Sequence, residues 1–587
     1  MKCSDRATPY TPLKYYKKQL IIGPVFKLAE AVFELLIPTM MVYVIDKGIA
    51  ENNSSYIIKM GLLMLCIALI GLGSALICQY NASVACTGYS TRLRNMLYSR
   101  ISGLSHKELD TLGTAALINR LTGDVNVLQQ AVAMLIRLVI RAPFISIGSM
   151  VMAMILNLKL SLIIIAVFPL LVLAIFLVMK ATVPLYRKVQ YRLDRLSSIL
   201  RENLSGVRVI RAFTAEHREQ ERFDGENSEF TKAYIKVNKI SSLLNPVTSI
   251  IMNGAILLIL WLGGLNVESG NMTAGEIIAF TNYISYMVVA MLVVAKLVVL
   301  FSKAKASADR VAEVLNTHST LEEPAISAVP DFSQPALEFE NVCLSYTEGK
   351  NALENINFTL KAGETLGIIG GTGSGKSSLV NLIPRYYEAT WGSVKVFGHN
   401  VREYQLSALR KLAVMAAQKA VLFSGTVFDC IRMGNPGATD QQVETAAKAA
   451  QAHEFIMQKS GQYNEVIDRG GANFSGGQKQ RLSIARALAA EPKILIMDDC
   501  TGALDYATDA ALWEAVNTMY KDITKVIVSQ RPDTVRRADK ILVMDNGKVA
   551  GIGTHAQLYE SCPIYREICL CVSDEDSQCE SGEDENV

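Results

Sequence analysis

Residues 365–378 read TLGIIGGTGSGKSS, and this stretch decides the fold of the C-terminal half of the chain. The run at 365–369 predicts a buried strand, and Gly370–Ser377 fits the pattern G-x-x-x-x-G-K-[ST] where that strand turns into a helix. Glycines there let backbone N–H groups face phosphate oxygens, Lys376 reaches the β- and γ-phosphates, and the Ser377 hydroxyl suits Mg²⁺. The sequence therefore predicts a nucleotide-phosphate site formed by Gly370, Gly371, Thr372, Gly373, Ser374, Gly375, Lys376, Ser377 and Ser378.

A second strand predicts where a magnesium ion binds. The apolar run Ile494–Met497 ends at Asp498, whose carboxylate would hold Mg²⁺ through its water shell. From Ala336 onwards, β-branched and aromatic runs such as KILIMD and KVIVSQ alternate with helical ones, which is typical of a mostly parallel α/β sheet. We therefore expect residues 336–570 to form an α/β P-loop nucleotide-binding domain.

The N-terminal half has a different composition. Five stretches of roughly 17 or more residues contain no charge, enough to cross a hydrocarbon core about 30 Å thick. A further stretch, Leu20–Ile45, is interrupted by Lys27, Glu30 and Glu34. A buried soluble helix could mimic one such run but not six in series, so we expect residues 20–305 to form an all-α transmembrane domain of six helices. The five uncharged stretches are Met60–Tyr80, Ala142–Leu158, Leu160–Met179, Leu243–Asn266 and Ile277–Ala295.

The loops between these stretches alternate in length and predict the topology. The long loop at 184–245 carries many Lys and Arg, as cytosolic loops near membrane ends do. We therefore expect a multi-pass protein of the cell membrane (plasma or inner membrane), with the segment 1–19 and the C-terminus both in the cytosol. Residues 185–209 have helical spacing, so the fourth span is predicted to continue as a helix about 37 Å into the cytosol.

Two further segments and the charge balance complete the organisation. Three prolines among Ser and Glu predict a linker over 306–335, and 571–587 is predicted to be an acidic, disordered tail. The chain has 58 basic and 55 acidic residues, a net charge of +3 and a pI near 8.2. Nucleic-acid-binding domains show clustered Lys and Arg and a pI above about 9, so no nucleic-acid partner is expected.

The segment between the glycine-rich loop and Asp498 distinguishes among the families of P-loop proteins. Residues 474–478 read FSGGQ and are followed by KQRLSIARAL. This resembles the ATP-binding-cassette family, whose signature sequence is LSGGQ. Tyr346 resembles the aromatic residue that stacks on adenine, Gln418 the Q-loop glutamine, and Gly502–Asp505 the D-loop. In the membrane half, LLIPTMMVYVIDKGI, INRLTGDVNVL and ENLSGVRVIRAF resemble the exporter type.

The resemblance implies a half-transporter that works as a dimer and couples ATP hydrolysis to transport. In that arrangement the signature of one chain closes over the ATP held by the P-loop of the other. The implied ligands are ATP and Mg²⁺, with Ser377, Gln418 and Asp498 around the metal. The signature residues that would contact the partner's ATP are Ser475, Gly476, Gly477 and Gln478.

Two residues depart from the family pattern. Asp499 stands where the family places a glutamate that polarises the attacking water, and a misplacement near 1 Å can cost about a hundredfold in rate. Gln530 stands at the position of a switch histidine and cannot carry the imidazolium charge. Gly502 also replaces the usual serine of the D-loop. We expect Asp499, Gln530 and Gln418 to form a catalytic set that binds MgATP and hydrolyses it slowly; the alternative is that Asp499 suffices as the base.

A weak site beside a nearly intact signature resembles one subunit of heterodimeric bacterial multidrug exporters. The favoured hypothesis is therefore a subunit of an exporter of amphipathic small molecules or peptides, located in the lipid bilayer. It would act with a second half-transporter, and a heterodimer with a different chain is favoured over a homodimer. An ATP-binding regulatory or channel-like membrane subunit and an importer of a metal chelator are the alternatives. Glu30 or Glu34 could recognise the substrate, although structural pairing with a basic residue such as Arg137 or Arg141 is favoured.

Overall fold

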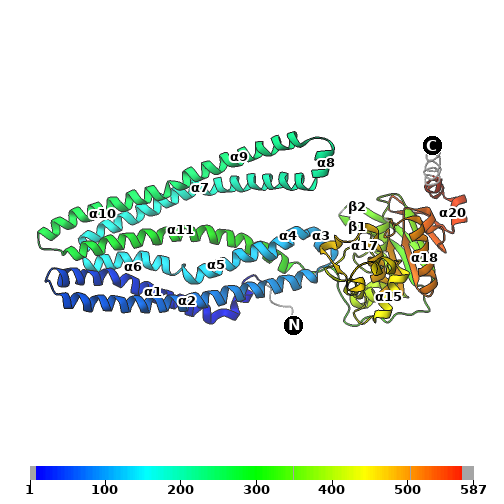
Figure 1. Cartoon of the computed structure of the whole chain (residues 1–587), viewed down its shortest axis with the longest axis horizontal. Coiled ribbons are helices and arrows are strands. Elements are labelled where there is room, and N and C mark those ends of the chain that lie inside the picture. The colour runs from blue at the N-terminus through cyan, green and yellow to red at the C-terminus, as the bar shows by residue number, and fades with distance from the viewer. Residues whose placement is uncertain (1–7, 348, 503, 571–587) are drawn as a thin grey trace. The chain divides into compact units, whose positions relative to one another are not determined.

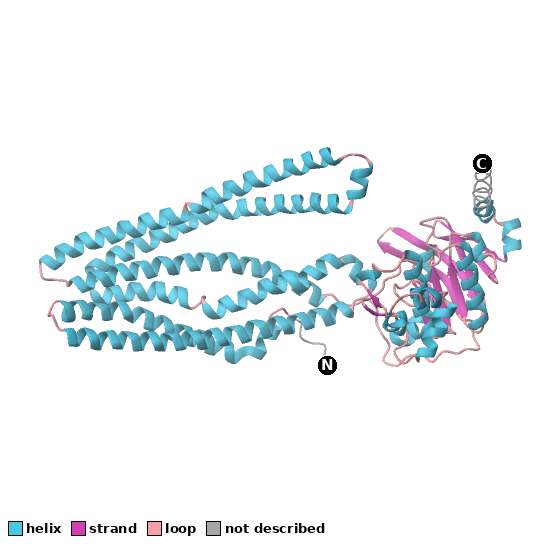
Figure 2. Ribbon diagram, in the orientation of Figure 1, coloured by secondary structure: helices cyan, strands magenta, loops and turns pink. Residues whose placement is uncertain are grey.

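The computed structural model describes residues 8–347, 349–502 and 504–570. The chain forms two compact units. The first contains residues 8–103 and 113–318, and the second contains residues 104–112 together with the chain from Ser319. Figure 2 shows that the described strands all belong to the second unit. The predicted acidic tail at 571–587 lies outside the described residues.

The first unit is helical, and five of its described segments are long and apolar enough to cross a membrane: 54–102, 114–156, 158–205, 216–268 and 274–316. Helix α1 corresponds to the first predicted span, which completes the set of six, and it contains the three charges that interrupt that span. The predicted all-α membrane domain is therefore confirmed, with α1 as its charged member. The helices of this unit are α1 (Lys17–Tyr43), α2 (Ser54–Ser102), α4 (Thr114–Asn119), α5 (Val125–Arg137), α6 (Arg141–Leu156), α7 (Leu158–Ser205), α8 (Val207–Ala212), α9 (Glu216–Ser242), α10 (Leu244–Glu268) and α11 (Ala274–Asn316).

Helix α7 has the length that the sequence predicted for the fourth span and its extension. It runs without interruption to Ser205 and ends at Gly206, whose backbone is not helical. The short helix α8 then turns the chain, and α9 returns beside α7 (Figure 1). The guanidinium of Arg192 on α7 pairs with the carboxylate of Glu226 on α9 at 3.1 Å. Ion pairs of this kind add to the few buried apolar side chains of this region, such as Val189, Ile199 and Val237, in holding α7 and α9 together.

The second unit is built on a six-stranded sheet with the order β12-β11-β3-β10-β9-β6. Strands β11, β3, β10, β9 and β6 are parallel, and β12 is antiparallel to β11. Strands β9 and β10 are buried at every residue, as expected for parallel strands covered on both faces. Ile494 and Ile496 face one apolar core, whereas Leu495 and Met497 face the other. The α/β prediction for this domain is confirmed.

A second, antiparallel sheet has the order β2-β1-β4-β5, and β7 pairs with β8. The strands are β1 (Leu337–Thr347), β2 (Lys350–Leu360), β3 (Thr365–Gly370), β4 (Trp391–Val396), β5 (His399–Asn400), β6 (Ala413–Ala416), β7 (Gly425–Thr426), β8 (Val466–Ile467), β9 (Ile494–Asp498), β10 (Thr524–Val528), β11 (Lys540–Asp545) and β12 (Lys548–Gly553). The helices of this unit are α3 (His106–Leu112), α12 (Lys376–Val380), α13 (Leu406–Leu412), α14 (Val427–Arg432), α15 (Asp440–Ala449), α16 (His453–Met457), α17 (Gly476–Ala489), α18 (Tyr506–Met519), α19 (Pro532–Val535) and α20 (His555–Ser561).

Candidate functional site

The glycine-rich loop lies between β3 and α12, where the sequence predicted it. Gly373 and Gly375 have φ values of 82° and 101°, which L side chains rarely adopt. A Cβ atom on Gly370 would lie 2.1 Å from the carbonyl oxygen of Met544, so only glycine fits there. The loop, Gly370–Gly375, therefore requires glycine for its turn and for its close approach to β11.

Lys376 begins α12 and is buried beneath the loop. Its ammonium group donates hydrogen bonds to the carbonyl oxygens of Gly370 and Gly371, both at 2.8 Å. Burial lowers the pKa of Lys376, and the nearby carboxylates Asp499 and Asp498 oppose that shift. A cation held inside a phosphate loop in this way is available to the β- and γ-phosphates of a nucleotide once it exchanges its carbonyl partners.

The residues at the predicted magnesium position lie together. Ser377 donates a hydrogen bond from its hydroxyl to the carboxylate of Asp498 at 3.0 Å. Asp498 ends β9 and is buried, and this burial raises the pKa of its carboxyl group although Ser377 and Lys376 act in the opposite direction. A carboxylate and a hydroxyl at the same point are oxygen ligands that Mg²⁺ prefers. The donor set therefore fits the ion that the nucleotide would bring.

Asp499 follows directly and lies between the two glutamines that the sequence placed in the catalytic set. Its Oδ2 atom accepts a hydrogen bond from the Gln418 amide at 3.2 Å and another from the Gln530 amide at 3.3 Å. Its backbone has a φ of 46°, and its N–H donates to the carbonyl oxygen of Val528 at 2.9 Å. The structure thus brings Asp499, Gln418 and Gln530 together around one carboxylate oxygen.

The signature segment forms the start of a helix. Ser475 caps α17: its hydroxyl accepts a hydrogen bond from the Gln478 N–H at 3.4 Å, and the Gln478 side chain accepts one from the Ser475 N–H at 3.0 Å. Phe474, which replaces leucine of the family pattern, is buried against Phe455, so the substitution preserves an apolar anchor. The exposed Ser475 and Gly476 leave the N-terminus of a 14-residue helix open, which suits a phosphate group.

Tyr346 lies at the end of β1, beside the phosphate loop. Its ring is 43% exposed, and its hydroxyl group lies 3.1 Å from the hydroxyl of Ser378 on α12. An exposed aromatic ring at this point can stack on a nucleotide base. The D-loop residue Ala503 lies outside the described residues. Its neighbours are held by Arg531, which donates to the carbonyl oxygens of Gly502 at 3.3 Å and Leu504 at 3.2 Å.

Comparison with known proteins places these motifs in one family. Residues 20–291 match the family model of the ABC transporter transmembrane region, and residues 353–502 match that of the ABC transporter, the ATP-binding domain. The chain belongs to the ATP-binding-cassette (ABC) transporter family. It is 33% identical over 557 residues to the uncharacterized ABC transporter ATP-binding protein YfiB of Bacillus subtilis, covering 95% of this chain and 96% of the relative.

Other relatives extend over similar lengths. The uncharacterized ABC transporter ATP-binding protein Rv1273c of Mycobacterium tuberculosis is 33% identical over 566 residues, covering 96% of this chain and 97% of that protein. The fold is similar to the structure of a bacterial Atm1-family ABC exporter with ATP bound, with a TM-score of 0.79. That match has 21% sequence identity and covers 94% of this chain and 99% of the other. The chain is therefore a membrane subunit with the fold of ABC exporters, which work as dimers within the membrane.

A group of contacts that the motifs did not reveal surrounds α3. Asp110 on this helix accepts a hydrogen bond from the Tyr387 hydroxyl at 2.5 Å, and the Tyr387 ring packs edge-on against Tyr346 at 5.0 Å. His106 lies 4.6 Å from Tyr386, ring centre to ring centre. A continuous path of side chains therefore joins α3 to the aromatic residue of the nucleotide site.

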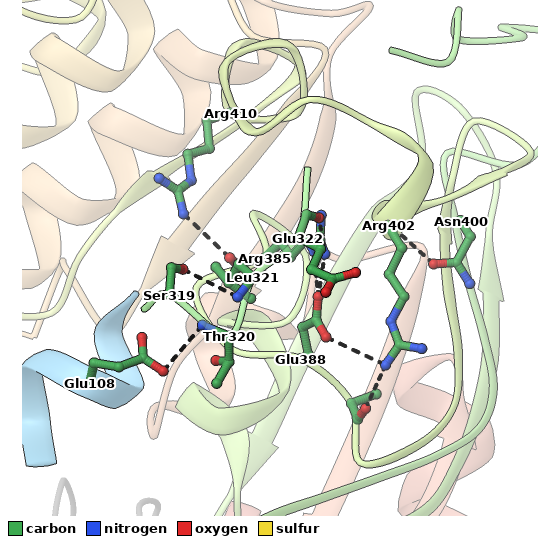
Figure 3. Close-up of polar contacts among 11 residues, drawn as sticks. Glu108, Ser319, Thr320, Leu321, Glu322, Arg385, Glu388, Asn400, Arg402 and Arg410 are labelled. Atoms are coloured by element: carbon green, nitrogen blue, oxygen red, sulfur yellow. Dashed lines mark hydrogen bonds and ion pairs between the residues drawn. The ribbon is translucent and has the colours of Figure 1, made fainter. Parts of the chain in front are cut away.

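The chain that follows the last membrane helix is held to the same unit. Glu108 on α3 accepts a hydrogen bond from the backbone N–H of Thr320 at 3.3 Å, as Figure 3 shows. Arg385, which is only 2% exposed, donates to the carbonyl oxygen of Glu322 at 2.9 Å and forms an ion pair with Glu388 (Figure 3). Thr320 and Glu322, within the predicted linker, are therefore anchored by polar contacts to α3 and to Arg385.

The observed contacts come from the segment Ser105–Asp110, whereas residues from Gly113 onwards belong to the membrane unit. The signal that could have located it is the S-x-x-E pattern of Ser105 and Glu108, a capping box at the start of a short helix. The long-range partners Tyr386 and Tyr387 carry no such local signal.

Proposed function

We propose that this chain is one subunit of an ATP-driven membrane exporter that works as a heterodimer, and that its own ATP site hydrolyses slowly. The observation that carries the proposal is the environment of Asp499. Its carboxylate is one methylene shorter than the glutamate of the family pattern, and it is shared by two neutral amides, Gln418 and Gln530. A base in this arrangement is held back from the phosphates, and no imidazolium supports the transition-state charge.

The residues of the site divide the work of binding. In the proposed mechanism the loop N–H groups and Lys376 bind the β- and γ-phosphates, Tyr346 stacks on the base, and Ser377, Asp498 and Gln418 hold the metal. Bound Mg²⁺ would neutralise part of the negative charge of the phosphates. These groups are complete in the chain, so MgATP should bind normally even though its hydrolysis is slow.

The signature serves a different ATP molecule. In the proposed dimer, Ser475, Gly476, Gly477 and Gln478 close over the nucleotide bound by the partner. The exposed N-terminus of α17 supports this role, because the dipole and the first backbone N–H groups of a helix stabilise a phosphate placed at that end. The partner would then supply the catalytic glutamate, and the pair would have one fast site and one slow site.

The proposed location and cargo follow from the membrane half. Six helices and a Lys- and Arg-rich loop support insertion in the cell membrane with both termini in the cytosol. Cargo taken from the bilayer or its surface would be amphipathic, either a small molecule of the multidrug type or a peptide. The proposed transmembrane domain covers residues 20–305, the proposed linker 306–335 and the proposed nucleotide-binding domain 336–570.

The test is ATP-dependent accumulation in inside-out membrane vesicles. The chain is expressed with an affinity tag in its native cells, and fluorescent amphiphiles of negative, zero and positive charge are supplied outside the vesicles. We expect at least one amphiphile to accumulate with ATP but not with a non-hydrolysable analogue, and a second half-transporter to copurify. Absence of any ATP-driven accumulation, or a purified homodimer with rapid turnover, would contradict the proposed function.

A further inference from the structure

Five charged residues cluster within the membrane helices, where charges are expensive. Lys27 on α1 bonds Glu30 at 2.7 Å, and Arg141 on α6 bonds Glu34 at 2.6 Å. The fifth member, Arg137, lies at the end of α5. Charged side chains at bilayer depth normally pair or face a polar cavity, and they mark functional sites.

The two carboxylates are both accounted for. Glu30 also lies 4.0 Å from Arg141, so that Lys27, Glu30, Arg141 and Glu34 form one connected network of two positive and two negative charges. This pairing confirms the structural interpretation of Glu30 and Glu34 and leaves neither free to bind a cationic cargo.

Arg137 is the charge that remains. Among the described residues its guanidinium has one hydrogen bond from Nη2, to the hydroxyl of Ser83 on α2 at 3.3 Å. Its Nε atom is buried and has no hydrogen-bond partner among the residues that the structure describes. A hydroxyl satisfies one N–H group but does not neutralise the charge. The cluster thus has three cations for two carboxylates, and the surplus is located on Arg137.

The depth of the cluster places it inside the membrane. Helix α6 runs from Arg141 to Leu156, which corresponds to about 22 Å at 1.5 Å per residue. Glu34 lies about the same distance before Ile49, the end of the helical segment that follows α1. Both values fall within a hydrocarbon core of about 30 Å. Arg137 lies one further helical turn away, toward the boundary of that core.

The backbone beside Arg137 is irregular. Residues 138–140 separate α5 from α6, and the N–H groups of Leu138 and Val139 both bond the carbonyl oxygen of Met134, at 2.8 and 3.3 Å (Figure 1). Non-helical backbone at membrane depth is tolerated only where it is buried in protein or lines a polar cavity. Broken helices with charged neighbours are where transporters of other folds bind their substrates.

Apolar side chains adjoin the charges. Ile145 on α6 packs with Ala31 on α1 and Ala290 on α11, and the half-buried rings of Phe144 and Tyr286 pack against this group. Ala31 lies between Glu30 and Glu34 in the sequence, and Ile145 is one helical turn from Arg141. This apolar group therefore adjoins the ion-paired residues Glu30, Glu34 and Arg141, and Arg137 precedes Arg141 by four residues in the chain.

We propose that Arg137, the helix break at 138–140 and the rings of Phe144 and Tyr286 form a binding site for an amphipathic anion. Arg137 binds the carboxylate or phosphate of the ligand, and the apolar group contacts its hydrocarbon or aromatic part. The ion pairs of Glu30 and Glu34 fix the helices that carry the site. As a statement about cargo this inference rests on the proposed export function, but binding itself does not require it.

The experiment measures binding without ATP. The full-length chain with its copurified partner is placed in phosphatidylcholine nanodiscs, and saturable binding of pyrene-labelled dodecanoic acid is measured above that of empty nanodiscs. Pyrene-labelled dodecanol and dodecylamine are the matched neutral and cationic probes. The variants are Arg137→Gln and Arg137→Lys. Lys180→Gln is the control, since it removes a positive charge at similar depth on α7.

We expect the native protein to bind the acid at least about tenfold more tightly than the alcohol or the amine, which corresponds to about 1.4 kcal/mol. Arg137→Gln should lose that preference, while Arg137→Lys and Lys180→Gln keep it. Equal binding of the three probes by the native protein would overturn the site, and this result does not depend on any variant folding. A preference that survives in a folded Arg137→Gln variant would overturn it as well.

Further measurements distinguish an anionic lipid from a free amphiphile as the ligand, and they test the binding site independently of the proposed export function. Displacement of the acid by phosphatidylglycerol in the nanodisc would identify the natural ligand as an anionic lipid, and its failure would identify a free amphiphile; both keep the site. Charge-selective binding without ATP-driven accumulation would leave the site standing and remove the export function. ATP-driven accumulation without a preference for the acid would support the export function and rule out the proposed site.

Discussion

Replacing Asp499 with Glu and Gln530 with His should convert the slow site into a fast one. The Asp499 carboxylate is one carbon–carbon bond, roughly 1.5 Å, short of the glutamate position. A misplacement near 1 Å costs about a hundredfold in rate, equivalent to about 2.7 kcal/mol of barrier. The histidine would replace a neutral amide, now 3.3 Å from Asp499, with a group that can carry positive charge.

The assay is steady-state phosphate release by the purified full-length chain in nanodiscs, with the oligomeric state recorded for each sample. We expect the double variant to exceed the native chain by about a hundredfold. Asp499→Asn serves as the control and should fall to the background if the native carboxylate contributes at all. Native turnover already near the ordinary enzyme value of about 10 s⁻¹, or a double variant with an unchanged rate, would show that Asp499 and Gln530 do not slow the site.

Three further predictions concern the anchoring of α3 and the linker, each measured by thermal unfolding of the nucleotide-binding domain in the full-length protein. Tyr387→Phe removes the 2.5 Å bond to Asp110 and should cost about 1 kcal/mol, with an unchanged midpoint counting against it. Arg385→Ala removes the buried partner of Glu388, which keeps only its longer ion pair with Arg402 at 3.6 Å, and should cost about 3 kcal/mol, or several degrees; an unchanged midpoint would show that the buried pair contributes nothing. Burial and the charge of Arg410 lower the pKa of His106, so the unfolded chain binds its proton more tightly; stability should fall as pH drops below about 6.5, and His106→Phe should abolish that dependence.

The parts of the site that lie close together in sequence were predictable. The strand at 365–369 and the loop after it are set by local pattern, and the structure has β3 and α12 at those positions. The length of α7 followed from helical spacing, and Gly206 marked its end. In each case one backbone requirement or one periodicity determines the element.

Contacts between distant residues were not predictable in the same way. Asp110 and Tyr387 are 277 residues apart, and neither belongs to a motif that names its partner. The charges of α1 were visible in the sequence, but their pairing with Arg141 rather than Arg137 depends on how α5 and α6 are offset at residues 138–140. Hydropathy reports the depth of a charge and not its neighbour.

In the proposed heterodimer this chain binds one ATP at a site that hydrolyses it slowly, and its signature residues contact the second ATP, which the partner binds. This division between the two sites is tested most directly by ATPase measurements on the native complex carrying either Lys376→Ala or Ser475→Arg in this chain. We expect Lys376→Ala to keep most of the turnover, because that lysine serves the slow site, and Ser475→Arg to abolish it. Loss of turnover in Lys376→Ala with retention in Ser475→Arg would show that this chain's own site is the fast one.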